Sequence, residues 1–473
     1  MNARWMWGLV LGFGLAMGCG DGSGGASPED GSAPDGHANP DGSNPGDGGM
    51  PPCALPTPFD HGATYDAEIH VAEGGADDGD GTAASPLASL QEAAGRATAG
   101  TRIVLHAGTY PSQGFIDGLE GTPDHPIAIV GEGTVVLDAD GDDEVLHLTE
   151  PRYVVLEGLT LRGASLNGLN IDDGGTFDTP AGPVVLRDLT VFDVGTGGNH
   201  DCIKLSGLDD FFILGGDFSE CSAGGSMIDM VGCHDGLIAG NHFHDSPSAS
   251  GIQTKGGSSD ILIHGNRFVD VDGRVINAGG STGLAFFRPA DAPYEAARIR
   301  VVGNHFVRVG GGSGTVMAYV GCDACVFANN TVFEPRQWVA RILQESTDER
   351  FVPSRLGSFV SNLLVLEVDD LSTFVNVGPD TAPETFTFGW NLWWALDRDD
   401  AWEGPVYGGG VPPETESLIQ VDPHLSDLDG DDPRITAPSP AIGNGRPLDD
   451  PSYPDLFGRC YGDPPTIGAH EPR

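Results

Sequence analysis

Short β-rich apolar runs recur along most of the chain, as in Tyr153–Leu156 and Asp260–Ile263. Elsewhere apolar residues alternate over four to six positions, and alternation with a period of two indicates β-strands. Several of these runs precede a motif of a small residue, Asn, any residue and an apolar residue. Consecutive motif asparagines are 25, 38, 26 and 32 residues apart. These asparagines are Asn241, Asn266, Asn304, Asn330 and Asn362.

A repeat of about 25 residues made of short strands and turns is typical of a β-solenoid. We therefore predict an all-β parallel β-helix whose coils stack about 4.8 Å apart, with apolar residues inside and the asparagines bonded to one another. Longer spacings between motifs indicate loops inserted at the turns. Helical repeats would need an apolar stripe with a 3.6-residue period, and a propeller would need a repeat nearer to about 40 residues.

The two ends of the predicted β-helix also carry signals. Ser85–Ala94 predicts a short N-terminal capping helix, with Ser as its cap and Pro at its first position, which covers the open edge of the first coil. Two stretches near the start resemble the entry segment of bacterial right-handed β-helix proteins of the pectate-lyase-like superfamily, namely Gly79–Thr82 and Gly108–Tyr110. Two near the end resemble the closing segment of the same proteins, namely Ser439–Gly443 and Ile467–Glu471.

That resemblance implies a right-handed parallel β-helix (solenoid) over residues 53–421 and a C-terminal capping segment of the same domain over residues 422–473. It does not imply one activity, because the superfamily includes lyases, hydrolases, epimerases and non-catalytic surface proteins.

The N-terminus predicts export. Arg4 precedes an apolar run, Trp5–Met17, which has the length of a signal-peptide core and is too short to span a bilayer. Leu15–Cys19 resembles a bacterial lipobox, which implies a signal peptide over residues 1–18 and an acylated Cys19. An ordinary secretory peptide is the alternative, but the Gly-, Asp-, Ser- and Pro-rich residues 19–52 favour a disordered tether behind a lipid anchor.

We therefore expect a monomeric lipoprotein held by its lipid at the cell surface or periplasmic face of a Gram-negative bacterium. A net charge of −46 argues against nucleic acid as a partner, because no basic face is available to release counterions. If Cys19 is acylated, seven cysteines remain, so at least one has no partner within the chain. Cys322 and Cys325 predict a local disulfide or two buried thiols, since nothing nearby completes a zinc site.

Candidate binding residues follow from aligning consecutive coils. Ile203, Ile228, Ile252 and Ile276 form one inward stack in this alignment, so the residue after each of them points outward. His200 and Asp201 lie close to the rim of this face, where an extended polysaccharide can run along the stack. The predicted outward ladder consists of Lys204, Asp229, Gln253 and Asn277.

A candidate catalytic residue lies two positions further along one of these strands. Ile252–Ser258 is similar to the strand that carries the base lysine in the alginate lyase and chondroitinase B family, which implies that Lys255 removes a proton next to a uronate carboxylate. The same resemblance implies calcium on that carboxylate and an arginine on the following coil. Here that position falls near Asn277 or Ala278, so Arg274 and Arg288 are the candidates. A solvent-facing lysine that interrupts an exposed strand is the simpler interpretation, and we favour it.

Calcium is the one cofactor that the composition suggests. Asp138, Asp140 and Asp142 place carboxylates at alternate positions around a glycine, which suits oxygen ligation of a structural calcium ion. An acidic turn without metal fits the same pattern. The sequence as a whole predicts a cell-surface lipoprotein that binds an extended polysaccharide, either without catalysis or with an activity that the sequence does not establish. The alternative is a polysaccharide lyase that uses Lys255 as its base for β-elimination.

Overall fold

The computed structural model describes residues 53–221, 224–246, 249–427, 430–447 and 453–472. The predicted signal peptide, Cys19 and the tether lie outside the described residues. Among the described residues, no helix is long and apolar enough to cross a membrane.

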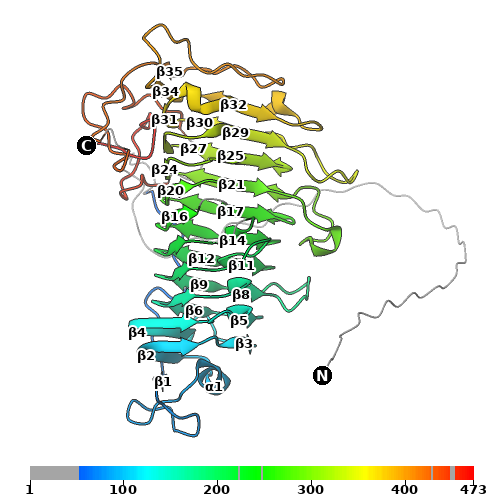
Figure 1. The fold of residues 1–473 in the computed structure, drawn as a ribbon, viewed down its shortest axis with the longest axis vertical. Helices are drawn as coiled ribbons and strands as arrows, with labels where there is room; N and C mark the ends of the chain where they lie inside the picture. The colour runs from blue at the N-terminus through cyan, green and yellow to red at the C-terminus, as the bar shows by residue number, and fades with distance from the viewer. Residues whose placement is uncertain (1–52, 222–223, 247–248, 428–429, 448–452, 473) are drawn as a thin grey trace, which may run out of the picture. The chain divides into compact units, whose positions relative to one another are not determined.

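The chain forms a right-handed parallel β-helix, as predicted, with its strands stacked coil upon coil (Figure 1). Every pair of named strands is parallel and links one coil to the next. One sheet of ten strands, here called the ladder sheet, runs along the stack. It consists of β3 (Gly114–Asp117), β5 (Glu144–Thr149), β8 (Asn167–Asp172), β11 (Ile203–Ser206), β14 (Ser226–Val231), β17 (Ser250–Lys255), β21 (Arg274–Gly279), β25 (Thr315–Val320), β29 (Gln337–Leu343) and β32 (Leu371–Val377).

The other sides of each coil belong to a continuous sheet of 22 strands and a small sheet of three. The large sheet consists of β1 (Ala67–Val71), β2 (Thr101–Pro111), β4 (Ile127–Asp138), β6 (Val154–Glu157), β7 (Thr160–Arg162), β9 (Val184–Arg187), β10 (Thr190–Phe192), β12 (Phe211–Leu214), β13 (Asp217–Ser219), β15 (Leu237–Ala239), β16 (His242–Ser246), β19 (Leu262–His264), β20 (Arg267–Val271), β23 (Arg300–Val302), β24 (His305–Val307), β27 (Val326–Ala328), β28 (Thr331–Phe333), β30 (Ser358–Val360), β31 (Leu363–Leu366), β33 (Thr387–Gly389), β34 (Leu392–Ala395) and β35 (Leu418–Ile419). The small sheet consists of β18 (Ser258–Ser259), β22 (Ala296–Ala297) and β26 (Cys322–Asp323).

Stacked phenylalanines fill part of the interior. The rings of Phe243, Phe268 and Phe306 come from consecutive coils and lie 4.7 and 4.8 Å apart with nearly parallel planes. These spacings equal the separation of neighbouring parallel strands. Each ring is fully buried, so the apolar position of the repeat becomes a continuous core.

An asparagine ladder runs beside this core. The side-chain amide of Asn266 donates to Asn304 at 3.0 Å, and that of Asn304 donates to Asn330 at the same distance. Each asparagine oxygen also accepts the backbone N–H of the previous asparagine. The predicted contacts among the five motif asparagines are confirmed, and the structure adds Asn391, which accepts from Asn362 at 3.2 Å.

The capping helix begins later than predicted. Helix α1 spans Leu90–Arg96, and its cap is Ser89 rather than Ser85. Asp77 explains the difference, because its carboxylate accepts the backbone N–H groups of Ala88 and Ser89 and holds them outside the helix. The chain before them pairs instead with β1, through a parallel bridge between Leu87 and Val71.

The segment after β35 lies along the flank of the coils. A disulfide between Cys53 and Cys460 ties it to the start of the described chain. Its Pro454 carbonyl accepts from the His264 ring at 2.8 Å, and its Thr466 carbonyl accepts from Asn329 at 2.9 Å. The segment therefore covers outward apolar residues of the large sheet. These include Val307, Leu363, Val365 and Leu392, packed against Ile435, Ala441 and Ile467.

Two further disulfides join Cys202 to Cys221 and Cys322 to Cys325, the second being the local pair that the CxxC spacing allowed. Cys233 is buried and free. Burial raises the pKa of its thiol to about 12, so this cysteine is inert packing rather than a nucleophile.

Replacing Asn304 with alanine should lower the free energy of unfolding by about 2–5 kcal/mol, because it leaves buried backbone and amide groups of the neighbouring coils without partners. Denaturant unfolding monitored by circular dichroism measures the change. Asn444→Ala is the control, since Asn444 is exposed and donates only to carbonyls of its own turn. Equal stability of the two variants would contradict a structural role for the ladder.

Candidate functional site

The predicted register of the ladder sheet is confirmed at every position. Ile203, Ile228, Ile252 and Ile276 pair in sequence and are at most 1% exposed. The residue after each isoleucine lies beside its counterpart on the next coil, so Lys204, Asp229, Gln253 and Asn277 form one column on the outward side.

The column continues toward the N-terminal coils. Asn170 pairs with Lys204, and His147 pairs with Asn170. Six consecutive strands thus present hydrogen-bonding side chains in one line, which spans about 24 Å at the spacing of parallel strands. This line is called the polar column and consists of His147, Asn170, Lys204, Asp229, Gln253 and Asn277.

Two lysines meet one buried carboxylate at the centre of the column. Asp229 is fully buried; its Oδ2 atom contacts the Lys204 amine, and its Oδ1 atom lies 3.1 Å from the Lys255 amine. Asp201, 1% exposed, lies 3.4 Å from the Lys204 amine on the other side. The two aspartates are buried, whereas the side chains of Lys204 and Lys255 are 19% and 12% exposed, so the lysines are the part of this cluster that solvent reaches.

Burial lowers the pKa of both lysines, against the opposing effect of Asp201. A lysine with a lowered pKa releases its proton more readily, which is the property a general base needs. Lys204 and Lys255 are also the only lysines in the sequence. The sequence has 69 acidic residues and only these two lysines, and they come from the two coils that flank Asp229. Sequence reasoning did not use this signal.

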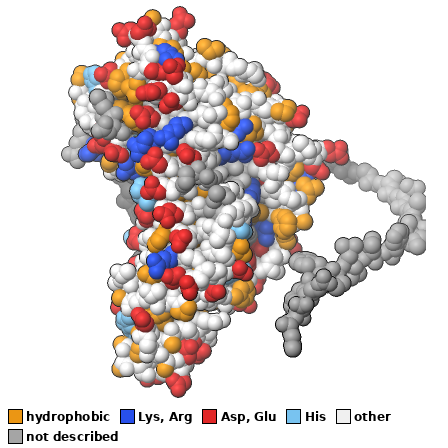
Figure 2. Space-filling model, in the orientation of Figure 1, with side chains coloured by type: hydrophobic (Ala, Val, Ile, Leu, Met, Phe, Trp, Pro, Cys, Tyr) orange, Lys and Arg blue, Asp and Glu red, His pale blue; other side chains and the backbone are white. Residues whose placement is uncertain are grey.

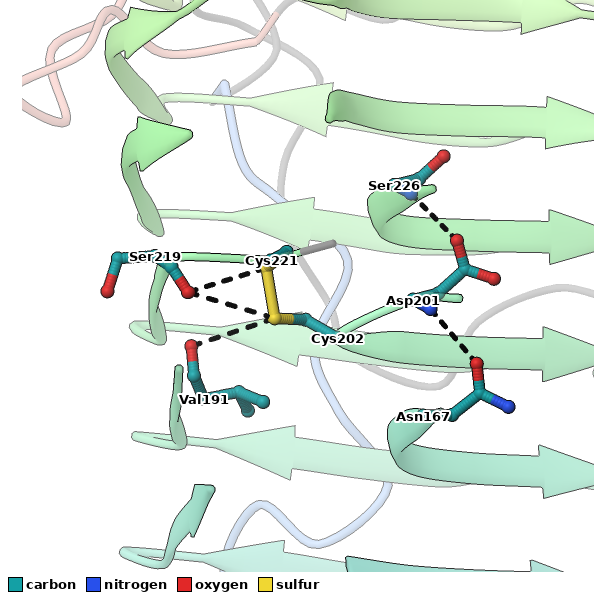
Figure 3. Close-up of a disulfide and its surroundings, with 7 residues drawn as sticks. All are labelled: Asn167, Val191, Asp201, Cys202, Ser219, Cys221 and Ser226. Atoms are coloured by element: carbon teal, nitrogen blue, oxygen red, sulfur yellow. Dashed lines mark hydrogen bonds between the residues drawn. A yellow bond between two sulfur atoms is a disulfide. The ribbon is translucent and has the colours of Figure 1, made fainter. Parts of the chain in front are cut away.

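Asp201 has a structural role at the start of the ladder strands (Figure 3). Its backbone N–H donates to Asn167 on the coil below, and its Oδ1 atom accepts the N–H of Ser226 on the coil above, at 2.9 and 2.7 Å. The disulfide from Cys202 lies beside it and fixes this turn. His200, the preceding residue, is half-buried, and its Nδ1 atom has no hydrogen-bond partner among the described residues.

Gln253 and Asn277 extend the column upward. The Gln253 side chain accepts from the Ser226 hydroxyl at 3.3 Å and donates to the Gly279 carbonyl at 3.4 Å. Asn277 is 3% exposed and accepts from Arg274 at 3.5 Å. Both predicted binding residues therefore lie on the column, with Gln253 the more accessible.

The structure does not bring the three predicted catalytic cations together. Arg274 is the first residue of β21, whereas Lys255 aligns near Gly279 at the end of that strand, five residues or about 16 Å away. The Arg274 guanidinium pairs with Glu345 at 2.6 Å. Arg274 therefore does not lie beside Lys255, because the two side chains start from opposite ends of adjacent strands.

Arg288 is also engaged elsewhere. Its guanidinium makes two hydrogen bonds with Asp173, at 2.5 and 2.7 Å, and lies 4.2 Å from the centre of the exposed Phe177 ring. The side chain crosses the turns after β14 and β11, where any side chain at Gly232 or Gly207 would collide with it. The loop that carries Arg288 folds over the edge of the ladder sheet, so this arginine joins loop to coil.

The predicted calcium ligands do not converge either. Asp138 pairs with Arg162 at 2.7 Å, and Asp142 accepts from the Ser112 hydroxyl at 2.7 Å. Asp138 also accepts the backbone N–H of Asp140, as in an acidic turn. Among the described residues, one group of three side chains alone has metal-ligating atoms within 4.8 Å of one another, and none of these aspartates belongs to it.

Sequence reasoning missed the lower end of the column. His147 lies between two carboxylates, 2.7 Å from Asp172 and 3.0 Å from Glu144, and these contacts raise its pKa to about 9. Burial raises the pKa of the Glu144 and Asp172 carboxyls, but their hydrogen bonds, including those with His147, outweigh it, so the pKa of each is lowered. The imidazole is therefore a cation at neutral pH.

Comparison with solved structures places the fold. Pectate lyase Pel9A is similar, with a TM-score of 0.50 and 14% identity over 87% of this chain and 98% of that chain. The chain has a pectate-lyase-like β-helix fold. An alginate lyase from Paenibacillus sp. str. FPU-7 has a TM-score of 0.41 and 18% identity over 67% of this chain and 96% of its own. PfbA, a surface adhesin of Streptococcus pneumoniae, has a TM-score of 0.43 and 10% identity over 63% of this chain and 78% of its own.

No protein-family model matches the sequence. No curated protein sequence matches it either.

The stability of the His147 cluster should depend on pH. Because folding raises the pKa of His147 from 6.5 to about 9, its stabilisation is complete below pH 6.5 and is lost as the pH rises through about 9. His147→Gln should therefore cost about 1–3 kcal/mol of unfolding free energy near pH 6 and close to nothing near pH 10. Denaturant unfolding at both pH values measures this.

The matched control is His125→Gln, which removes an exposed imidazole that pairs with Asp66 alone. It should change stability little at either pH, since exposed ion pairs contribute little. A His147→Gln effect that is equal at the two pH values would contradict a charged imidazole in the folded protein.

Proposed function

We propose that the protein binds an extended polysaccharide along the outward face of the ladder sheet. The observation that carries this proposal is the polar column, six hydrogen-bonding side chains in register on consecutive coils. Near its centre the mostly buried amines of Lys204, in the column, and Lys255, beside it, both contact Asp229. A polymer of repeating units offers polar groups at regular intervals, and a β-helix offers partners at intervals of about 4.8 Å. The similar fold of a pectate lyase supports a carbohydrate as the ligand.

The charges favour binding through hydrogen bonds rather than through a cationic patch. Asp201 and Asp229 balance the charges of Lys204 and Lys255, and acidic side chains are scattered widely over the face shown in Figure 2. Lysine amines supply three donors each, and hydroxyl-rich sugars supply the acceptors.

Exposed aromatic side chains lie on the loops that follow two strands of this sheet. Phe177, after β8, is 42% exposed, and Phe286, after β21, is 60% exposed. Arg288 links them, since its guanidinium lies over the Phe177 ring and donates to the Phe286 carbonyl. Exposed rings beside a polar column give a sugar both an apolar and a polar surface to contact.

A second candidate function is β-elimination with Lys255 as the base. The lowered pKa of Lys255 favours it. The reaction also needs a cation beside the uronate carboxylate to neutralise its charge. Both candidate arginines are already paired with carboxylates of the protein, Arg274 with Glu345 and Arg288 with Asp173. Binding without cleavage is therefore the function that the geometry supports better.

The predicted export and lipid anchor remain part of this proposal. Three disulfides among the described residues support folding in an oxidising compartment. Anchoring through Cys19 would place a binding domain at the membrane surface of a Gram-negative cell, on a tether of residues 19–52. The expected calcium ion is tested by measuring polysaccharide binding once with added calcium and once with a chelator.

Removing one lysine should weaken polysaccharide binding. Lys255→Gln and Lys204→Gln should each lower the affinity about tenfold or more, because each removes a charged donor from a partly buried site. In either variant Asp229 keeps the other lysine as its partner. Affinity electrophoresis or calorimetry with alginate, pectate, chondroitin sulfate and a neutral glucan measures the effect.

The control is Arg96→Gln, which removes one positive charge from α1, where Arg96 pairs with Glu92. It should bind as the original protein does. If both lysine variants bind as tightly as Arg96→Gln, the ligand does not lie on the polar column.

Ultraviolet absorbance separates binding from elimination. We expect binding without any growth of the unsaturated-uronate signal, with calcium or with chelator. A signal that rises with pH, with an apparent pKa below about 10.4, and disappears in Lys255→Ala would instead establish the lyase. Proton abstraction requires the neutral amine, so the rate of a lysine-based lyase increases as the pH rises.

A further inference from the structure

A second cluster of chemically active side chains lies on the large sheet, away from the polar column. Asp217 is on β13, and His242 and His244 are on β16, the next coil. Asp217 and His242 pair in register. His244 follows two residues after His242, so both rings point outward on the same face of the strand.

The three side chains are arranged around one point. The His242 Nδ1 atom lies 3.1 Å from one Asp217 oxygen, and the His244 Nε2 atom lies 3.1 Å from the other. All three ligand atoms lie within 4.8 Å of one another, the single such group of three among the described residues. Their side chains are 23–45% exposed, so an ion could enter from solvent.

A neighbouring carboxylate orients one of the rings. The Nδ1 atom of His244 lies 2.7 Å from Asp245. When Nδ1 donates its proton to Asp245, the Nε2 lone pair of a neutral His244 faces the Asp217 carboxylate, and only a proton or a metal ion makes that contact favourable. Imidazole ligands of metal ions are commonly held this way, with a carboxylate on the second nitrogen.

The two imidazole rings stack 4.3 Å apart. Two neutral rings this close together can share one divalent cation. The nearest cation on the next coil is Arg267, which pairs in register with His242, and its charge is compensated by an ion pair with Asp431.

We propose that Asp217, His242 and His244 bind one divalent transition-metal ion of the zinc class. Two imidazole nitrogens and one carboxylate suit zinc and its neighbours, whereas calcium takes oxygen ligands. Three protein ligands leave a coordination position open to water. The ion would link the coils of β13 and β16 on the outside of the stack, independently of polysaccharide binding.

Calorimetric titration of the chelator-treated full chain with zinc chloride tests the proposal, with cobalt absorption spectra as a second readout. His244→Gln and Asp217→Asn should each lose one bound equivalent and the visible cobalt bands. Asp245→Asn should keep the ligands and weaken binding about 10–100-fold, because it removes the carboxylate that orients His244. Zinc should raise the unfolding temperature of the original chain and not that of His244→Gln.

Two control variants locate the bound ion. His125→Gln removes a histidine with a single acidic partner, and His106→Gln removes one ring of the stacked pair His70–His106. Both should bind zinc as the original chain does. The assignment is overturned if the original chain does not bind zinc. It is also overturned if folded His244→Gln and Asp217→Asn still bind zinc, or if His106→Gln is the variant that loses it.

Discussion

Parallel backbone pairing between consecutive coils is the constraint on which the rest of this protein depends. It repeats each register position about every 4.8 Å, so a side chain inside the stack always lies next to its counterparts above and below. Phenylalanines then stack ring on ring, and buried asparagines satisfy one another and the turn backbone. Insertions have to leave the stack at a turn. The long loop between β21 and β22 does so and returns over the edge of the ladder sheet, where Arg288 anchors it to Asp173.

The same spacing governs where charges can lie. A buried charge is costly unless an opposite charge and hydrogen bonds compensate it, and in a β-helix the partner comes most readily from the adjacent coil. Asp229 between Lys204 and Lys255 follows this rule, as does His147 against Asp172 on the next coil. A strongly acidic protein can therefore keep its two lysines mostly buried in the middle of one face. Their position reflects local pairing, and the net charge of −46 does not determine it.

The sequence predicts the register where the coils are regular and fails where they are not. From Ile203 to Ile276 the successive isoleucines are 25, 24 and 24 residues apart, so the sequence directly predicts the alignment of Lys204, Asp229, Gln253 and Asn277. His147 was missed because 34 residues separate Asn170 from Lys204, and Asn391 because Trp390 replaces the small residue of the motif. Arg288 lies in an insertion that has no register, and α1 begins late because Asp77, distant in sequence, holds the preceding turn.

A fold with these constraints binds through fixed geometry. Moving one coil relative to the next would break a row of backbone hydrogen bonds, so the groups of the polar column cannot close around a ligand as a hinged site does. Preorganisation of this kind removes an ordering cost from binding, and it also makes the coil spacing part of the specificity. A polymer whose polar groups repeat out of step with the coils can satisfy only some of the column, whatever its charge. The same rigidity holds Asp217 and His244 at a separation that suits one small cation, because both side chains extend from strands that the backbone pairing has already fixed.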